Sequence, residues 1–325
     1  LFLSAIATAM SPPEDYLPAS DLLLIPGVTS FVPFWWPALA LIFALVIHEY
    51  SHGIQARAHG MRLRSFGLLL VGPVPIGAFA EPEESEMDRA PRRDRMRLFA
   101  AGPSINILAT YVVLILLSSI ASGMAAEHDG VHARSIVAGG PAEQSGLSPF
   151  ETVTHIQGQE VIDYDGFTEL MRDLSSGDTV SLTVLSSPTS GDSREERFVD
   201  VTLGDRYQYY IDQCDGDAGC IDEVVKILEI LEIQQGDAFL GVADLRSSTG
   251  AVEGYANIVE GKYTIGGTVL FTLLEPLVML GEPIQNDGHT MILQEREMLV
   301  AGDGFFASIL GTEGILMLFD FLFWL

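Results

Sequence analysis

An H-E-x-x-H motif at the end of a charge-free stretch constrains this chain more than any other feature. The motif holds His48, Glu49 and His52, and residues 33–47 before it contain no charged side chain. On a helix, two histidines four positions apart lie on one face, about one turn from each other. Two imidazoles so placed can bind one zinc ion, and the glutamate after the first can serve as a general base. We therefore predict a helix with His48 and His52 as zinc ligands and Glu49 as the catalytic base.

The surroundings of the motif predict a membrane helix. Residues 31–47 form a charge-free run long enough to lie in a bilayer, where ionisable side chains are costly and are usually retained for function. Residues 98–120 form a second run of this kind, and a third apolar helix is expected from residue 305 onward. The alternative reading of the motif is an interfacial helix whose two histidines bind no metal.

Arginines mark one side of this membrane. Nearly half of the chain's 17 basic residues lie between residues 48 and 104, and all of these are arginines. By the positive-inside rule, the connection between the first two spans faces the cytoplasm. We therefore expect a multi-pass protein of the cell membrane, with its metal site towards the cytoplasmic side and the segment after the second span outside.

Residues 66–80, between two groups of arginines, are apolar but contain several glycines and prolines. A spanning helix does not tolerate this density of helix breakers. Irregular backbone at membrane depth has to be covered by protein or line a cavity. The pattern predicts a short hairpin beside the metal helix, with an ordinary re-entrant loop as the alternative.

Acidic residues are concentrated in a different part of the chain. The net charge is −27, and most of the acidic side chains lie between residues 126 and 261. Residues 131–186 alternate strand-like runs with turn signals, which predicts a soluble α+β module with helices at 141–146 and 166–174 and a strand at 179–185. Such an acidic surface argues against nucleic acid as a partner, because it repels phosphates.

A polar stretch at about 187–237, with a helix expected at 221–233, reads as an insertion in this module. It contains the only two cysteines, Cys214 and Cys220. Outside the cell, a pair this close can form a disulfide that closes a small loop. The aspartates around them lack the spacing of an EF-hand, so calcium is the weaker reading.

These patterns predict a polytopic α-helical membrane protein with an inserted α+β domain. Residues 1–125 form the N-terminal membrane core and residues 126–248 the inserted domain. Residues 249–325 form the C-terminal membrane part. Because residues 1–10 and 315–325 are apolar, we expect a sequence cut within membrane segments at both ends.

Several motifs, in this order, resemble the site-2 protease family of intramembrane zinc metalloproteases. The resemblance covers most of residues 31–245, and the inserted domain is similar to a PDZ domain. The motifs are H-E-Y-S-H-G at 48–53, G-P-V-P-I-G-A-F at 72–79, A-G-P-S-I-N at 101–106, the PDZ-like run at 135–158 and A-F-L-G-V at 238–242.

The resemblance implies hydrolysis of peptide bonds in or near the transmembrane segments of membrane protein substrates, with Zn²⁺ as the cofactor. Asn106 is a lone amide in an apolar helix, and by itself it suggests either a bond to a neighbouring helix or a role at the site. With the resemblance, the hairpin around Gly77 and Asn106 are expected to hold an extended substrate. The PDZ-like domain, with backbone amides around Gly241, is expected to bind a C-terminus freed by an earlier cut outside.

One part of the family pattern is missing. The family's third zinc ligand is an aspartate in an L-D-G motif, which does not occur in this sequence and is expected shortly beyond Leu325. Asp320 is the only intramembrane aspartate available as a substitute within the chain, and it is the weaker reading because no glycine follows it. One rival function is a membrane-anchored PDZ binding module with an inactive metal site. Another is a zinc protease acting on soluble peptides at the membrane surface.

Overall fold

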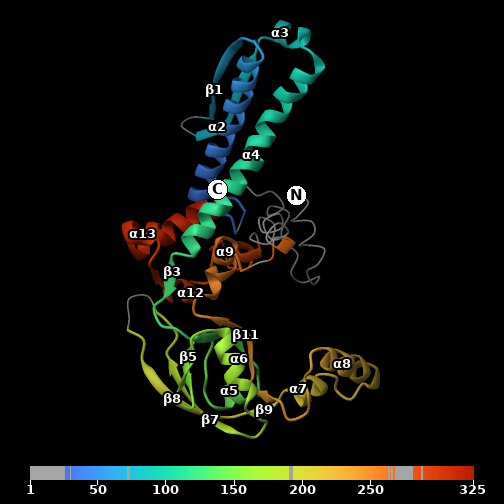
Figure 1. Cartoon of the computed structure of the whole chain (residues 1–325), viewed down its shortest axis with the longest axis vertical. Helices are drawn as coiled ribbons and strands as arrows, with labels where there is room; N and C mark the ends of the chain where they lie inside the picture. Colours follow the sequence, from blue (N-terminus) through green and yellow to red (C-terminus); the bar gives the residue numbers. More distant parts are fainter. Residues whose placement is uncertain are drawn as a thin grey trace. The chain divides into compact units, whose positions relative to one another are not determined.

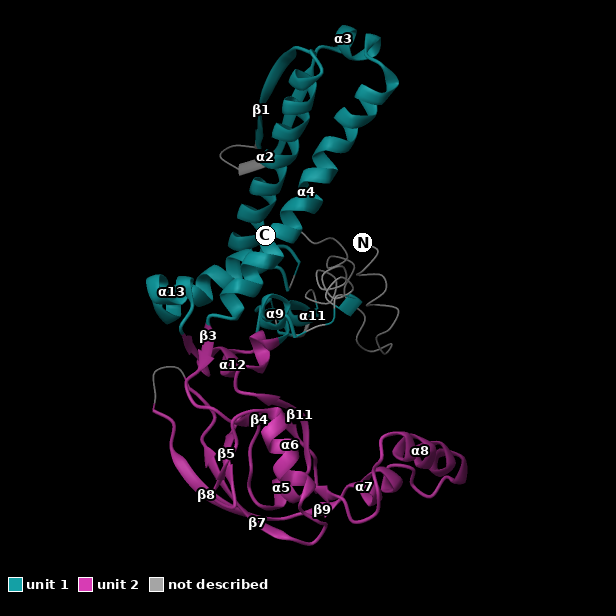
Figure 2. Cartoon of the chain, in the orientation of Figure 1, with its two compact units in different colours: residues 1–123, 254–291, 303–325 teal, residues 124–253, 292–302 magenta. Residues whose placement is uncertain are grey.

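The chain forms two compact units (Figure 2). The first combines residues 1–123, 254–291 and 303–325, and the second combines residues 124–253 and 292–302. The computed structural model describes residues 26–29, 31–71, 74–189, 193–262, 264, 266–267, 281–286 and 288–325. The apolar segment predicted at residues 1–10 lies outside this range.

Among the described residues, three helices of the first unit are long and apolar enough to cross a membrane by length and composition: α2 (Trp35–Ala58), α4 (Arg92–Ala121) and α13 (Phe305–Trp324). α2 and α4 run side by side (Figure 1). Both predicted spans are confirmed as helices, but each helix extends further into the arginine-rich region than its charge-free run. Pro103 lies inside α4 without ending it; a proline removes only one backbone hydrogen bond of a helix.

α13 is not one straight helix. Gly311 has φ of 66° and ψ of −177°, which is a non-helical backbone within the range of α13. A positive φ of this kind is accessible to glycine without steric cost. Gly311 therefore divides α13 into a short first part and a longer second part.

A two-stranded antiparallel hairpin, β1 (Leu63–Val71) and β2 (Val74–Pro82), follows α2 and packs along it (Figure 1). The predicted hairpin is confirmed, and the re-entrant loop is wrong. Gly77 pairs with Leu69, next to an irregularity in the register. The short helix α3 (Glu84–Arg89) then leads to α4.

Two further short helices, α9 (Gly250–Glu260) and α11 (Gly281–Gln285), belong largely to the first unit. The buried hydroxyl of Ser118 on α4 donates to the carbonyl of Tyr255 and accepts from the N–H of Val259. These bonds fix α9 against α4.

The second unit is built on an antiparallel six-stranded sheet in the order β11-β4-β5-β7-β8, with β6 paired to β5. Its core lies between the sheet and the helices α5 (Pro141–Gln144) and α6 (Tyr164–Arg172). Every second side chain of β7 is buried over most of its length, as expected for a strand with one face on a core. The strands are β4 (Val131–Ile136), β5 (Thr152–Ile156), β6 (Gln159–Glu160), β7 (Thr179–Leu185), β8 (Glu196–Thr202) and β11 (Val242–Ser247).

The predicted insertion at about 187–237 begins too early, because residues 196–202 form β8 of the sheet; only the part after β8 is inserted, and it is helical and disulfide-bonded. It contains α7 (Arg206–Asp212) and α8 (Ala218–Ile230), between the paired strands β9 (Gly204–Asp205) and β10 (Ala238–Phe239). A disulfide joins Cys214 to Cys220, as predicted, and links the end of α7 to the first turn of α8.

Residues 292–302 return to the second unit, so the prediction that all of residues 249–325 form a membrane part is wrong for this segment. β12 (Leu299–Ala301) pairs with β3 (Met124–Ala126), and α12 (Leu293–Glu297) precedes it. Each of these two strands has only three residues, which is too short to show a periodic pattern in the sequence. Their pairing is therefore set by the tertiary structure.

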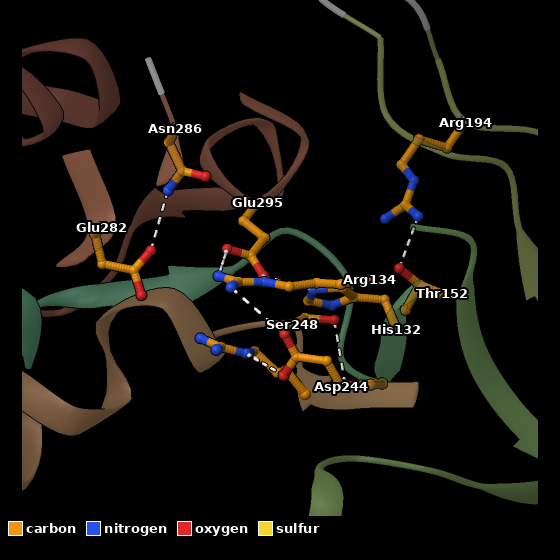
Figure 3. A network of polar contacts seen from close by, with 11 residues as sticks. His132, Arg134, Thr152, Arg194, Asp244, Ser248, Glu282, Asn286 and Glu295 are labelled. Carbon is orange, nitrogen blue, oxygen red and sulfur yellow. Dashed lines mark hydrogen bonds and ion pairs between the residues drawn. The ribbon is translucent and has the colours of Figure 1, made fainter. Parts of the chain in front are cut away.

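Glu295 of α12 anchors this returning segment. Its carboxylate accepts two hydrogen bonds from Arg134, both 2.7 Å, and one from His132, 3.1 Å (Figure 3). Glu295 and His132 are completely buried. Burial alone would raise the pKa of Glu295, but the hydrogen bonds from His132 and Arg134, with the charge of Arg134, outweigh it and lower the pKa to about 2.

Candidate metal centre

His48, Glu49 and His52 project from α2 as one cluster. Their candidate ligand atoms all lie within 4.8 Å of one another, and all three residues are partly buried. The two imidazole rings meet edge to face with centroids 4.9 Å apart. In the described part of the chain, no further histidine, cysteine, aspartate or glutamate joins this cluster. The helical spacing predicted from the motif thus brings the three side chains together.

The outer nitrogen of each histidine faces a group on α4. Nδ1 of His52 lies 2.7 Å from the carbonyl oxygen of Leu98. A carbonyl only accepts, so Nδ1 donates and Nε2 keeps its lone pair. Such an outer hydrogen bond is typical of metal-binding histidines, because it fixes the tautomer and the ring orientation.

The side-chain amide of Asn106 lies against His48. Its Nδ2 is 3.1 Å from Nδ1 of His48, and its Oδ1 is buried without a hydrogen-bond partner. Turning the amide by half a rotation exchanges these two atoms, which are nearly equal in size and shape. Oδ1 then accepts from Nδ1–H of His48, which leaves the lone pair of Nε2 of His48 free to bind a metal.

Gly102 leaves space next to both free nitrogens. A Cβ atom built on Gly102 would lie 2.3 Å from Nε2 of His48 and 2.5 Å from Nε2 of His52. These distances are close to a zinc–nitrogen bond of about 2.0–2.1 Å. The two Nε2 atoms therefore converge on a volume that only glycine leaves open, and the nitrogen donors suit zinc. These residues fit the ion that the motif predicts.

The hairpin holds the carboxylate of Glu49. The backbone N–H of Ala80 on β2 donates to Oε2 of Glu49 at 2.9 Å. Neither Ala80 nor Leu98 was expected at the site. Both contribute backbone atoms, so their side chains give no signal in the sequence. The predicted hairpin beside the metal helix was the one indication that Ala80 would lie near Glu49.

The remaining predicted residues lie elsewhere. Asp320 accepts a hydrogen bond from Thr290 and does not belong to the metal cluster. Gly77 lies on β2, three residues before Ala80. Gly241 is in the second unit, where its φ is 81° and a Cβ would approach Pro141 to 2.8 Å. Glycine is therefore required at position 241 by both the backbone and the close packing.

Comparison with known proteins supports this assignment. The model of peptidase family M50 matches residues 36–299, which include the metal cluster and most of the second unit. The uncharacterized protein MJ0971 of Methanocaldococcus jannaschii is 36% identical over 85 residues, covering 26% of this chain and 23% of that protein. The alignment thus spans less than a quarter of the relative. With the match to the family model over most of its length, the chain belongs to peptidase family M50, the site-2 protease family.

Proposed function

We propose that the protein is a zinc metalloendopeptidase that hydrolyses peptide bonds in or near transmembrane segments, as a step of regulated intramembrane proteolysis. One observation carries the proposal. Two imidazole Nε2 atoms converge beside Gly102 within apolar helices, next to a carboxylate. A metal cluster on helices of this composition has access to peptide bonds at membrane depth.

His48 and His52 would hold the zinc ion through Nε2, with their rings oriented by Asn106 and by the carbonyl of Leu98. Zinc, when bound, acidifies water and polarises a carbonyl group. Glu49 takes up the proton of the attacking water and passes it to the leaving nitrogen. Ala80 N–H donates to Oε2 of Glu49 and so holds the carboxylate in place for this role.

An extended substrate suits this site better than a helix does, since helical peptide bonds are already hydrogen-bonded and shielded. The hairpin β1–β2 offers backbone groups for pairing with such a segment close to Glu49. We propose that the stretch around Gly77 guides the substrate. For Asn106, the amide contact with His48 favours orientation of a zinc ligand over direct contact with substrate.

The second unit is proposed to be a PDZ-like domain that sorts substrates. α6 packs beside the edge strand β11, and the N–H of Tyr164 donates to the hydroxyl of Ser247 at 3.1 Å. Peptides commonly add to an exposed sheet edge of this kind. The loop before β11 contains Gly241, whose carbonyl accepts from Val137 N–H at 3.0 Å. Its amides are proposed to receive the C-terminal carboxylate of a substrate already cut outside.

The proposed topology places the metal site towards the cytoplasm and the PDZ-like domain outside, in a multi-pass protein of the cell membrane. The arginines at the start of α4 support the cytoplasmic side for the metal site. The disulfide between Cys214 and Cys220 supports the outside location of the PDZ-like domain, because disulfides persist in oxidising compartments.

Two variants test the catalytic proposal in the full-length protein. Glu49→Gln should retain zinc but lose cleavage of a membrane-spanning substrate, whereas His48→Ala should lose most of the zinc. Zinc content is measured by elemental analysis and cleavage by gel assay in detergent. Cleavage by Glu49→Gln at the unaltered rate would remove this residue from the mechanism. If the unaltered protein holds no zinc and cuts nothing but still binds peptide C-termini, the inactive binding module becomes the better description.

A further inference from the structure

The start of α4 presents arginines and apolar side chains on one surface. Arg92, Arg95, Met96 and Phe99 are spaced i, i+3, i+4 and i+7, so they follow one face of the helix. The side chains of Met96 and Phe99 are 60% and 62% exposed. We call these four residues, with the neighbouring Arg89 and Arg93, the α4 entry surface.

The arginines of this surface have no carboxylate partner in the described part of the chain. Asp94, the only acidic residue among positions 89–97, is already engaged, 3.6 Å from His59 and 3.9 Å from Arg97. Glu86 of α3 is bound by Arg62 at 2.6 Å. The guanidinium groups of Arg89, Arg92, Arg93 and Arg95 therefore remain available to an external anion.

The order of charged and apolar residues along the chain indicates the level of the membrane at which the arginines lie. The carboxylates Glu83, Glu84 and Asp88 come first, on and before α3, which lies at the tip beyond the start of α4 (Figure 1). The arginines follow, and the charge-free part of α4 begins with Leu98 directly after them. The arginines thus occupy the level between the acidic tip and the apolar helix, where a bilayer has its phosphate groups.

We propose that the α4 entry surface binds the headgroups of anionic phospholipids. The guanidinium groups pair with lipid phosphates, for which their planar donor geometry is well suited. Met96 and Phe99 lie along the adjoining acyl chains. Juxtamembrane basic clusters bind anionic lipids with about a fivefold gain per basic residue. The acidic second unit offers no comparable surface, since most of its charge has the opposite sign.

The test uses the full chain in nanodiscs of phosphatidylcholine with about a quarter phosphatidylglycerol. A photoactivatable phosphatidylglycerol or phosphatidylcholine probe is crosslinked, and labelled peptides are identified by mass spectrometry. Peptides covering residues 89–99 should be labelled preferentially by the phosphatidylglycerol probe, and Arg92→Gln/Arg93→Gln should lower this preference at least about fivefold. The matched control, Arg172→Gln/Arg206→Gln, neutralises two exposed arginines of the second unit and should leave it unchanged.

A lysine variant, added inorganic phosphate and a salt titration complete the test. Arg92→Lys/Arg93→Lys should retain most of the preference, because the charge is kept. Added inorganic phosphate should not displace the lipid, whereas sodium chloride should weaken the preference through screening. If the glutamine variant does not fold, the lysine variant and the salt titration of the unaltered chain decide. Equal labelling by both probes, a preference insensitive to salt, or displacement by inorganic phosphate would overturn the proposal.

Discussion

Replacing Gly102 by alanine tests the metal centre most directly. In an ordinary helix this change is stabilising by about 0.5–1 kcal/mol, because alanine loses less backbone entropy than glycine. Here the new Cβ would lie 2.3 Å from Nε2 of His48 and 2.5 Å from Nε2 of His52. Contacts under 3.0 Å are essentially never seen for real Cβ atoms, so the histidine rings must move or the metal must leave.

The expected loss of zinc affinity can be estimated from weaker perturbations of metal sites. Removing an outer hydrogen-bond partner of a metal ligand costs about 10–100-fold in metal affinity. A methyl group in the space of the ion itself should cost at least the upper end of that range, about 100-fold or about 2.7 kcal/mol. Cleavage should fall with zinc occupancy, while the helix content of the protein stays the same.

The assay is a competition titration of zinc with a chromophoric chelator, carried out on the purified protein alongside circular dichroism. Ser104→Ala serves as the matched control, since it also introduces alanine on α4 and its side chain is exposed. It should bind zinc with unaltered affinity. If Gly102→Ala binds zinc as tightly as the unaltered protein, the ion does not lie between Gly102 and the two Nε2 atoms.

Three further predictions follow from other contacts. Asn106→Ala should weaken zinc binding about 10–100-fold in the same titration by leaving Nδ1 of His48 unsupported, and unchanged affinity would remove Asn106 from the site. Because the pKa of Glu295 falls from 4.5 to about 2 on folding, its contribution of about 3 kcal/mol is fully present above about pH 4.5 and is lost as the pH falls towards 2. Hydrogen exchange of the β4 amides should become faster as the pH falls in this range, and Glu295→Gln should abolish this pH dependence. The same pH dependence in both proteins would contradict the role given to the Glu295 carboxylate. Replacing Cys214 and Cys220 by serine should cost the insertion about 2 kcal/mol and speed proteolysis between α7 and α8 without altering zinc content, and equal proteolysis rates would show that the helices hold the loop unaided.

The features predicted from sequence are those written in local patterns. The spacing of His48 and His52 sufficed to bring their rings together, because a helix leaves little freedom at i and i+4. The breakers in residues 66–80 predicted the hairpin, and alternation predicted β7 with its observed bounds. Apolar composition predicted the three long helices, although α2 and α4 extended into charged residues, because charge alone does not end a helix.

The features that were missed depend on distant parts of the chain. Ala80 and Leu98 act at the site through backbone atoms, which every residue type possesses. The pairing of β12 with β3 joins segments more than 170 residues apart, and strands this short leave no pattern. Glu295 reads as one acidic residue among many in the sequence, whereas its burial against Arg134 fixes an entire returning segment.

The break at Gly311 has a consequence for the lipid around α13. The helical part after the break, residues 312–324, extends only about 20 Å at about 1.5 Å per residue, against a hydrocarbon thickness of about 30 Å. The preceding part exposes Phe305 and Ile309, at 74% and 65%, as expected for a segment lying along the interface. The bilayer should therefore be locally thinned beside α13, and membranes of different thickness should change the tilt of this helix before that of the longer α4.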